Sequence, residues 1–306
     1  MRPSSLPMGG LLALLLPLFG FAMAGIWVRW LSPLDPLAIT AGRVAVALLV
    51  LVPATLFTRA ERRGALSYLR QPRVHGVAAR MIGFFGFAVA GFQLAPVALV
   101  VLMIGAAPAW VLVFERLSGG AIEPRRAAGV GLTLVGSAVA LLPSVLGALG
   151  GQEGAGSVAL GGLLGLTASF FNAAFVFGRS RLAARGVRPG AFLLATMTCL
   201  WGLLLYPLAA VTQLGALTPS TGFEGLALAG LGIVSTAAPL WGLSVASRLL
   251  PPLVVALVGP LLPFMAALAA WLLLGEAPPL AFALGAPIVV AGIALVVLPR
   301  RLTVPA

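Results

Sequence analysis

The strongest constraint on the fold is a series of long apolar segments, each close to the length of one membrane crossing. A helix needs about 20 apolar residues to span roughly 30 Å of hydrocarbon. Ten segments approach that length, at residues 8 to 30, 36 to 57, 78 to 94, 96 to 115, 127 to 146, 157 to 178, 190 to 213, 225 to 247, 252 to 274 and 279 to 299. Because 61% of the residues are hydrophobic and only 8% are charged, the chain lacks the polar surface that a soluble protein of this size needs. We therefore predict an all-α integral membrane protein with ten transmembrane helices.

The basic residues predict how these helices thread the membrane. All 19 are arginines, and they are spread over many short segments, so the net charge of +12 does not indicate a nucleic-acid partner. If the N-terminus lies in the cytoplasm, ten helices place 17 of the 19 arginines on the cytoplasmic side, and only Arg29 and Arg43 toward the outside. Arginine favours cytoplasmic loops. The sequence thus predicts a multi-pass inner-membrane protein in a lipid bilayer, with both termini cytoplasmic.

The two halves of the chain resemble each other. The stretch "PVALVVLMIGAAP" (96–108) aligns with "PLVVALVGPLLPF" (252–264), and an offset of 155 or 156 residues relates several glycines and prolines. The pairs are Pro96 with Pro251, Pro108 with Pro263, Gly129 with Gly285, Gly136 with Gly292 and Pro143 with Pro299. We predict two repeats, residues 1–150 and 151–306. Because each holds five helices, an odd number, the second repeat must enter the membrane from the opposite face.

Helix-breaking residues interrupt the ninth predicted helix in its middle. The segment "VVALVGPLLPFMAALAAWLLLGE" (254–276) contains Gly259, Pro260 and Pro263, and Pro108 holds the equivalent repeat position in the fourth helix. A mid-helix proline removes a backbone hydrogen bond, and protein or cavity water must satisfy the freed carbonyl. Transmembrane helices tolerate proline in general. The paired positions nevertheless favour two bent helices that face each other at a substrate cavity, with these four residues as helix-break and gating residues.

Polar residues inside the apolar segments are the candidates for contact with a small-molecule substrate. In the sixth helix, Asn172 and Ser169 lie on or beside a stripe of small residues, and a buried Asn serves either as glue between helices or as a substrate contact. The eighth helix has a similar stripe, for which close helix packing is the competing interpretation. The predicted substrate-cavity residues are Asn172, Ser169, Ser235, Thr236, Gln93 and Trp110. Trp110 and Gln93 have structural alternatives, as a space-filling side chain and as a group satisfied by water.

The residue types missing from the spans restrict the function. No Asp, Glu, His or Lys lies near the centre of a predicted span, and Arg29 and Arg43 are expected toward the outer helix ends. We therefore expect a charge-free cavity that suits a neutral or zwitterionic solute. The spans contain no nucleophile with its base and no metal-ligand set, so we predict no enzymatic activity, no catalytic residue, no metal and no cofactor. The oligomeric state stays open, and a monomer is compatible with the sequence.

The pattern resembles the drug/metabolite transporter superfamily, in its ten-helix branch built from two EamA-type repeats. The resemblance is strongest in "PFMAALAAWLLLGEAPPLAFALGAPIVVAG" (263–292), which contains Glu276, Gly285 and Gly292. The first repeat departs from this motif, since Glu115 is not the equivalent of Glu276. Members often carry Trp in the first and sixth helices, where this chain has "MAGIW" and "SFFNAAF", the latter with Asn172.

The resemblance implies an inner-membrane carrier with a central cavity formed by helices 1, 3, 4, 6, 8 and 9. It is closest in character to the exporters of aromatic and neutral amino acids. The expected function is thus export of small neutral or zwitterionic metabolites, in particular amino acids, by alternating access. An exporter of lipophilic drugs that uses the same cavity is the alternative.

Overall fold

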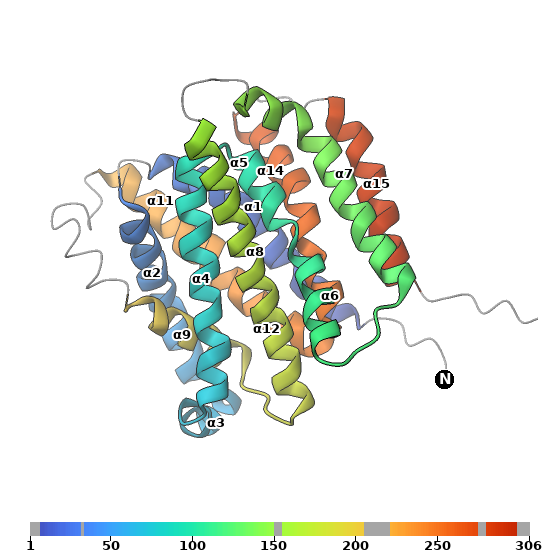
Figure 1. Ribbon diagram of the computed structural model, residues 1–306. Helices are drawn as coiled ribbons and strands as arrows, with labels where there is room; N and C mark the ends of the chain where they lie inside the picture. Colours follow the sequence, from blue (N-terminus) through green and yellow to red (C-terminus); the bar gives the residue numbers. More distant parts are fainter. Residues whose placement is uncertain (1–6, 32–33, 150–154, 205–220, 275–279, 299–306) are drawn as a thin grey trace, which may run out of the picture.

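The protein is a bundle of long helices (Figure 1). The computed structural model describes residues 7–31, 34–149, 155–204, 221–274 and 280–298, and no strand occurs in these ranges. The elements are α1 (Met8–Trp30), α2 (Pro36–Phe57), α3 (Arg59–Leu69), α4 (Pro72–Leu94), α5 (Val97–Ile104), α6 (Ala107–Leu117), α7 (Pro124–Leu149), α8 (Ala155–Ala184), α9 (Ala191–Gly202), α11 (Gly222–Gly232), the π-helix η1 (Ile233–Ala237), α12 (Ala238–Leu249), α13 (Pro252–Ala256), α14 (Val258–Leu274) and α15 (Leu280–Val297).

Nine segments of the described chain are long and apolar enough to cross a membrane, and they coincide with nine of the ten predicted spans. In the remaining span, predicted at 190–213, the described part is the apolar helix α9, and residues 205–213 lie outside the described ranges. The count of ten therefore stays a prediction. The sequence missed α3, which has no buried residue and lies where we expected only a connecting loop.

The helix boundaries follow from local sequence chemistry. Proline is the first residue of α2, α4 and α7, where its missing N–H has no helical partner to lose. At the start of α2, the carboxylate of Asp35 accepts a hydrogen bond from the amide of Leu37 at 2.7 Å and caps the helix. After α6 and α8, Gly119 and Gly186 take positive φ angles of 85° and 76°, which only glycine adopts without strain.

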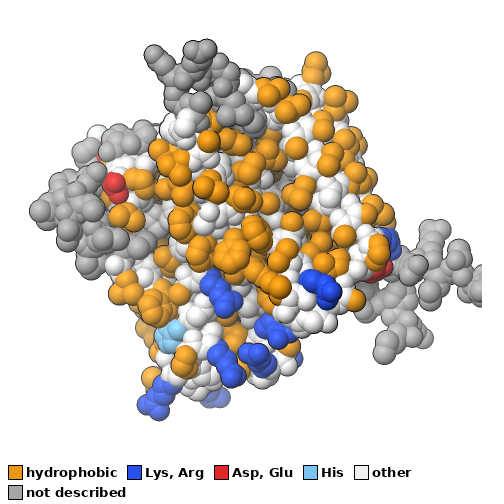
Figure 2. Space-filling model, in the orientation of Figure 1, with side chains coloured by type: hydrophobic (Ala, Val, Ile, Leu, Met, Phe, Trp, Pro, Cys, Tyr) orange, Lys and Arg blue, Asp and Glu red, His pale blue; other side chains and the backbone are white. Residues whose placement is uncertain are grey.

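The packing pairs helices from the two halves of the sequence. In Figure 1, α7 lies along α15 and α4 lies along α8, and α1 packs on α11 and α12. Figure 2 shows hydrophobic side chains over most of one face, with basic side chains gathered toward the end where α3 lies. A surface of this kind is suited to hydrocarbon, with a polar boundary at the arginine-rich end. The inverted relation between the halves stays a prediction.

Glycines let α7 and α15 approach until their backbones touch. A Cβ atom at Gly136 would lie 2.9 Å from the carbonyl oxygen of Gly285, and one at Gly129 would lie 2.8 Å from that of Gly292. These are the four glycines that the sequence repeat singled out. Because hydrocarbon provides no hydrophobic drive between helices, such close backbone packing is the main source of their association.

We predict that Gly136→Ala destabilises the protein by about 1–3 kcal/mol, because a backbone atom of α15 cannot move aside for the new methyl group. The control is Gly131→Ala in the same helix, where a Cβ atom would meet nothing within 4 Å. That substitution should stabilise the helix by roughly 0.5–1 kcal/mol. The free energy of unfolding in detergent micelles measures both. Equal effects of the two variants would contradict this packing.

Candidate functional site

Two membrane spans are broken into half-helices, and their breaks meet. The span formed by α5 and α6 is interrupted at Gly105 and Ala106, and the span formed by α13 and α14 is interrupted at Leu257. A Cβ atom at Gly259 would lie 3.3 Å from both the Cα atom of Gly105 and the carbonyl oxygen of Ile104. The interrupted spans therefore contact each other through glycine backbone.

The prolines lie close to these breaks. Pro108 and Pro260 occupy the first turns of α6 and α14, where proline is tolerated because the N–H has no helical partner. Pro263 lies within α14, which continues through it, so the interruption occurs at Leu257 and not at Pro263 as the sequence suggested. Pro108, Gly259, Pro260 and Pro263 are all buried. Their function in gating stays a prediction.

Beside the breaks lies a small enclosed cavity of about 20 Å³. Residues from both halves line it: Phe21 and Ala24 of α1, Arg43 of α2, Phe84, Ala88 and Phe92 of α4, Val101 and Ile104 of α5, and Leu262 of α14. A space of this size holds about one water molecule. This cavity is therefore almost closed.

Arg43 brings a guanidinium group to this cavity, so the expectation of a charge-free cavity was wrong. Arg43 is only 2% exposed, and it lies about 10 Å along the axis of α2 from Pro36, the first residue of that helix. The Nε atom donates to Thr236 Oγ1 at 2.8 Å and Nη2 donates to the carbonyl oxygen of Ser235 at 2.6 Å. The guanidinium carbon lies 4.2 Å from the ring centroid of Phe85. Within the described ranges no carboxylate pairs with it.

A π-helical turn supplies both oxygens that hold Arg43. In η1 the hydroxyl of Thr236 donates to the carbonyl oxygen of Leu231, five residues earlier, at 2.7 Å. The carbonyl of Ser235, within the same π-helical turn, accepts from Arg43. π-Turns within helices are frequent at functional sites, because they redirect backbone groups in this way. Ser235 Oγ is buried and has no hydrogen-bond partner.

None of the six predicted substrate-cavity residues lines this cavity directly. Ser235 and Thr236 reach it through Arg43, whereas Trp110, Ser169 and Gln93 form other contacts between helices. Trp110 Nε1 donates to Ser169 Oγ at 3.0 Å, and Gln93 Nε2 donates to the carbonyl oxygen of Leu34 at 2.9 Å.

Asn172 differs from these residues because part of its side chain lacks a partner. It is 8% exposed, and its Oδ1 atom is buried without a hydrogen bond. It shares one face of α8 with Ala168 and Phe175, which both belong to the central apolar cluster. An unpaired buried amide oxygen costs about 1–3 kcal/mol, so packing alone gives no reason for an Asn at this position.

Sequence reasoning missed Arg43 as a functional residue. The signal was present, since Arg43 interrupts an otherwise apolar stretch two turns into a predicted helix, and an ionisable residue at membrane depth indicates function by default. Because Arg43 was expected toward the outer end of its helix, it was not predicted as a residue of the cavity. In the described part of the chain, no group of three or more His, Cys, Asp or Glu side chains is placed to hold a metal ion.

In the described part of the chain, nine apolar spans, two of them broken where they meet, are typical of a multi-pass helical membrane protein of the transporter class. The family comparison specifies this class further. The profile of the EamA-like transporter family matches residues 8–142 and again residues 159–298, and the chain belongs to this family. Members of the family are transporters and not enzymes, so the protein is a membrane solute transporter.

The fold recurs in a known structure. A solved structure titled "Crystal structure of protein" matches with a TM-score of 0.71 and 22% sequence identity, over 94% of this chain and 96% of that chain. At this identity the likeness establishes the fold alone. The search of curated proteins found no match.

We predict that Thr236→Val destabilises the protein by about 1–3 kcal/mol, because Arg43 loses an acceptor for a buried charged donor. The control is Thr167→Val, which also removes a hydroxyl that donates to a backbone carbonyl, here four residues earlier, but lies at an exposed site on α8. We expect that change to stay within about 0.5 kcal/mol. Denaturant unfolding in micelles measures both. An effect of Thr236→Val no larger than that of Thr167→Val would show that this hydrogen bond contributes little.

Proposed function

We propose that the protein is a secondary transporter of the inner membrane that exports small neutral or zwitterionic metabolites, in particular amino acids. The observation that carries this proposal is Arg43, a buried cation beside the central cavity with no carboxylate partner among the described residues. A buried charge without a counter-ion is expensive in an apolar bundle. A substrate with a carboxylate group provides the missing partner.

The chemistry of guanidinium favours this choice. Its planar fork matches a carboxylate, and charge-assisted hydrogen bonds between the two are stronger than neutral ones. The hydrogen bonds of Arg43 to protein use Nε and Nη2, so Nη1 is available as a donor. The cavity also has three phenylalanines, Phe21, Phe84 and Phe92, which suit the apolar side chain of an amino acid.

The small size of the cavity supports a mechanism of alternating access. An amino acid does not fit into about 20 Å³, so binding requires the surrounding helices to separate. The broken spans meet through Gly105 and Gly259, a narrow contact without side chains. In our proposal, two inverted repeats at residues 1–150 and 151–306 move against each other about this contact, with both termini in the cytoplasm.

The alternative function is the export of lipophilic drugs. The phenylalanine-rich lining favours apolar ligands, but the charge of Arg43 repels the cationic ones. Uptake of a neutral amino acid into proteoliposomes, with no competition from hydrophobic dyes, supports amino-acid transport. Dye transport with no amino-acid transport contradicts it.

We predict that Arg43→Gln raises the KM for a transported neutral amino acid about 10- to 100-fold, because the carboxylate loses its charged donor. The wild-type protein should also transport the amino acid better than the corresponding amide, whose carboxyl group is blocked. The Arg43→Gln variant should show no such preference. The measurement is uptake of radiolabelled substrate into proteoliposomes.

Arg29→Gln is the control for Arg43→Gln. It removes the same charge from an exposed position in the last turn of α1, so KM should stay unchanged. If folded Arg43→Gln keeps the wild-type KM, or if the wild type carries acid and amide equally well, Arg43 does not recognise a carboxylate.

We further predict that Asn172→Ala lowers transport per folded molecule more than it lowers yield, because Oδ1 has no protein partner and is available to a substrate ammonium group. Asn172→Leu separates the two explanations, since it keeps the number and branched arrangement of side-chain heavy atoms and removes the unpaired oxygen. We expect Asn172→Leu to be as stable as wild type or more so, yet impaired in transport. Normal transport in both variants would assign Asn172 to packing.

A further inference from the structure

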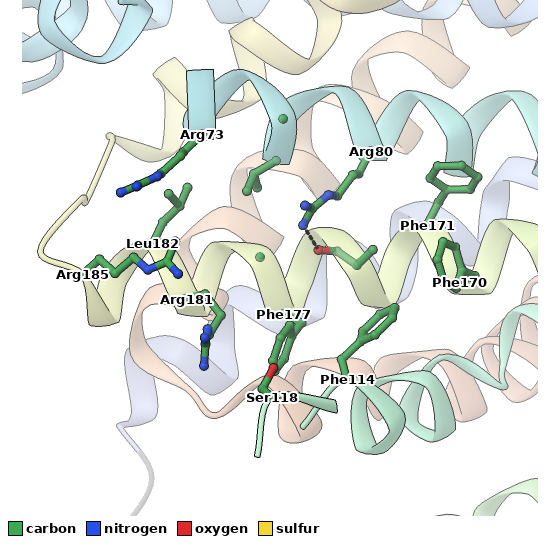
Figure 3. A pocket seen from close by; sticks show the side chains of 14 residues that line it. Arg73, Arg80, Phe114, Ser118, Phe170, Phe171, Phe177, Arg181, Leu182 and Arg185 are labelled. Carbon is green, nitrogen blue, oxygen red and sulfur yellow. Dashed lines mark hydrogen bonds between the residues drawn. The ribbon is translucent and has the colours of Figure 1, made fainter. Parts of the chain in front are cut away.

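A second, larger cleft of about 560 Å³ lies on the outside of the bundle, between α4, α8 and the end of α6. Figure 3 shows its side chains, which belong to two chemical kinds. The charged ones are Arg73 and Arg80 of α4 and Arg181 and Arg185 of α8, and the aromatic ones are Phe114, Phe170, Phe171 and Phe177. The cleft shares none of its lining residues with the central cavity.

The two kinds of side chain are separated along the cleft. Three of the arginines, Arg73, Arg181 and Arg185, gather at one end in Figure 3, and Phe170 and Phe171 lie at the other. From Phe170 to Arg185 the axis of α8 advances about 22 Å, more than half the thickness of the hydrocarbon core. The cleft is therefore amphipathic, with a charged end at the arginine-rich end of the bundle and an apolar end that reaches toward its middle.

The positive charge of the cleft is not compensated by the protein. No acidic residue lines it, and the ion pair found within the described ranges, between Arg126 and Glu115, involves none of the four arginines. The Nη1 atom of Arg80 donates to the carbonyl oxygen of Ala174 at 3.0 Å, and a Cβ atom at position 178 would meet this guanidinium at 2.5 Å. Gly178 thus provides the room in which Arg80 lies across α8.

We propose that this cleft binds an anionic phospholipid of the cytoplasmic leaflet. Its phosphate group contacts Arg80 and Arg181, and an acyl chain lies against Phe170 and Phe171. Guanidinium groups bind phosphate oxygens with two parallel hydrogen bonds. Basic pockets between transmembrane helices on the cytoplasmic side fit anionic headgroups, and that leaflet carries the anionic lipids. The inference rests on the membrane orientation proposed above but not on which solute the protein transports.

The apolar half of the cleft favours a lipid over a soluble phosphate. A free anion would use the arginines and leave the phenylalanines uncovered. Phe170 is 37% exposed, and the face of the protein turned to the viewer in Figure 2, on which α4 and α8 lie in Figure 1, carries many hydrophobic side chains. In a membrane this face lies against acyl chains, so the chain of a lipid held by its headgroup is already in position.

The test measures lipid binding to the purified full-length protein by native mass spectrometry. The probes are phosphatidylglycerol and phosphatidylcholine with identical acyl chains, and glycerol phosphate as the soluble headgroup. The cleft variant is R80Q/R181Q. The control is R62Q/R63Q, which removes the same charge from exposed positions on α3 that do not line the cleft. A Phe170→Ala variant tests the apolar half.

We expect selective binding of phosphatidylglycerol, weakened about fivefold per arginine and thus about 25-fold in R80Q/R181Q, but unchanged in the control. Phe170→Ala should also weaken the binding of phosphatidylglycerol, but it should have no effect on the binding of glycerol phosphate. Equal binding of both lipids, or equal losses in R80Q/R181Q and R62Q/R63Q, would overturn the site. If glycerol phosphate binds as tightly as the lipid, the cleft is a site for soluble anions and not a lipid site. Each outcome is independent of transport activity.

Discussion

Hydrocarbon offers no water to a free backbone carbonyl, and this constraint explains the centre of the molecule. Two spans are broken, and each break exposes polar backbone that another part of the protein must cover. The structure meets this requirement by bringing the breaks together at Gly105 and Gly259, where the absence of side chains allows backbone to pack on backbone. Nearby, Ser137 Oγ lies 3.4 Å from the carbonyl oxygen of Pro260 as a further donor. Irregular backbone and the crossing of the two halves therefore have one physical cause.

The same constraint accounts for Arg43 and the π-helical turn. A π-turn redirects backbone carbonyls, and a buried arginine needs acceptors. Here the carbonyl of Ser235 and the guanidinium of Arg43 satisfy each other at 2.6 Å, across residues that are 192 positions apart in the chain. The hydrogen-bonded pair fixes the direction of the guanidinium beside the cavity. Neutral protein groups solvate the charge without neutralising it, so the site keeps its attraction for an anionic group.

The sequence predicted the elements better than it predicted the site. Long apolar segments are local signals, which is why nine spans of the described chain could be anticipated. The repeat singled out Gly136 and Gly285 as members of separate pairs but did not predict that the two lie in contact. The location of Arg43 depends on which direction α2 faces and on a π-turn in a distant segment, and neither leaves a local pattern. Assigning the arginines to membrane topology also concealed that Arg80 and Arg181 lie in one cleft with phenylalanines. Glu276, which supported the family resemblance, lies outside the described residues.

The cleft and the central cavity are joined by one rigid element. Helix α4 contributes Arg73 and Arg80 to the cleft and Phe84, Ala88 and Phe92 to the cavity, within 23 residues that contain no proline after the first position. A continuous helix of this length moves as a unit, because bending it requires breaking backbone hydrogen bonds that hydrocarbon cannot replace. Separation of the cavity walls around Phe84 and Phe92 must therefore displace the arginines of the cleft, or else proceed through the helices on the other side of the cavity. Because α4 packs along α8, which carries Arg181 and Asn172, the proposed movement of the first repeat against the second would shift these two helices and so change the cleft that they line.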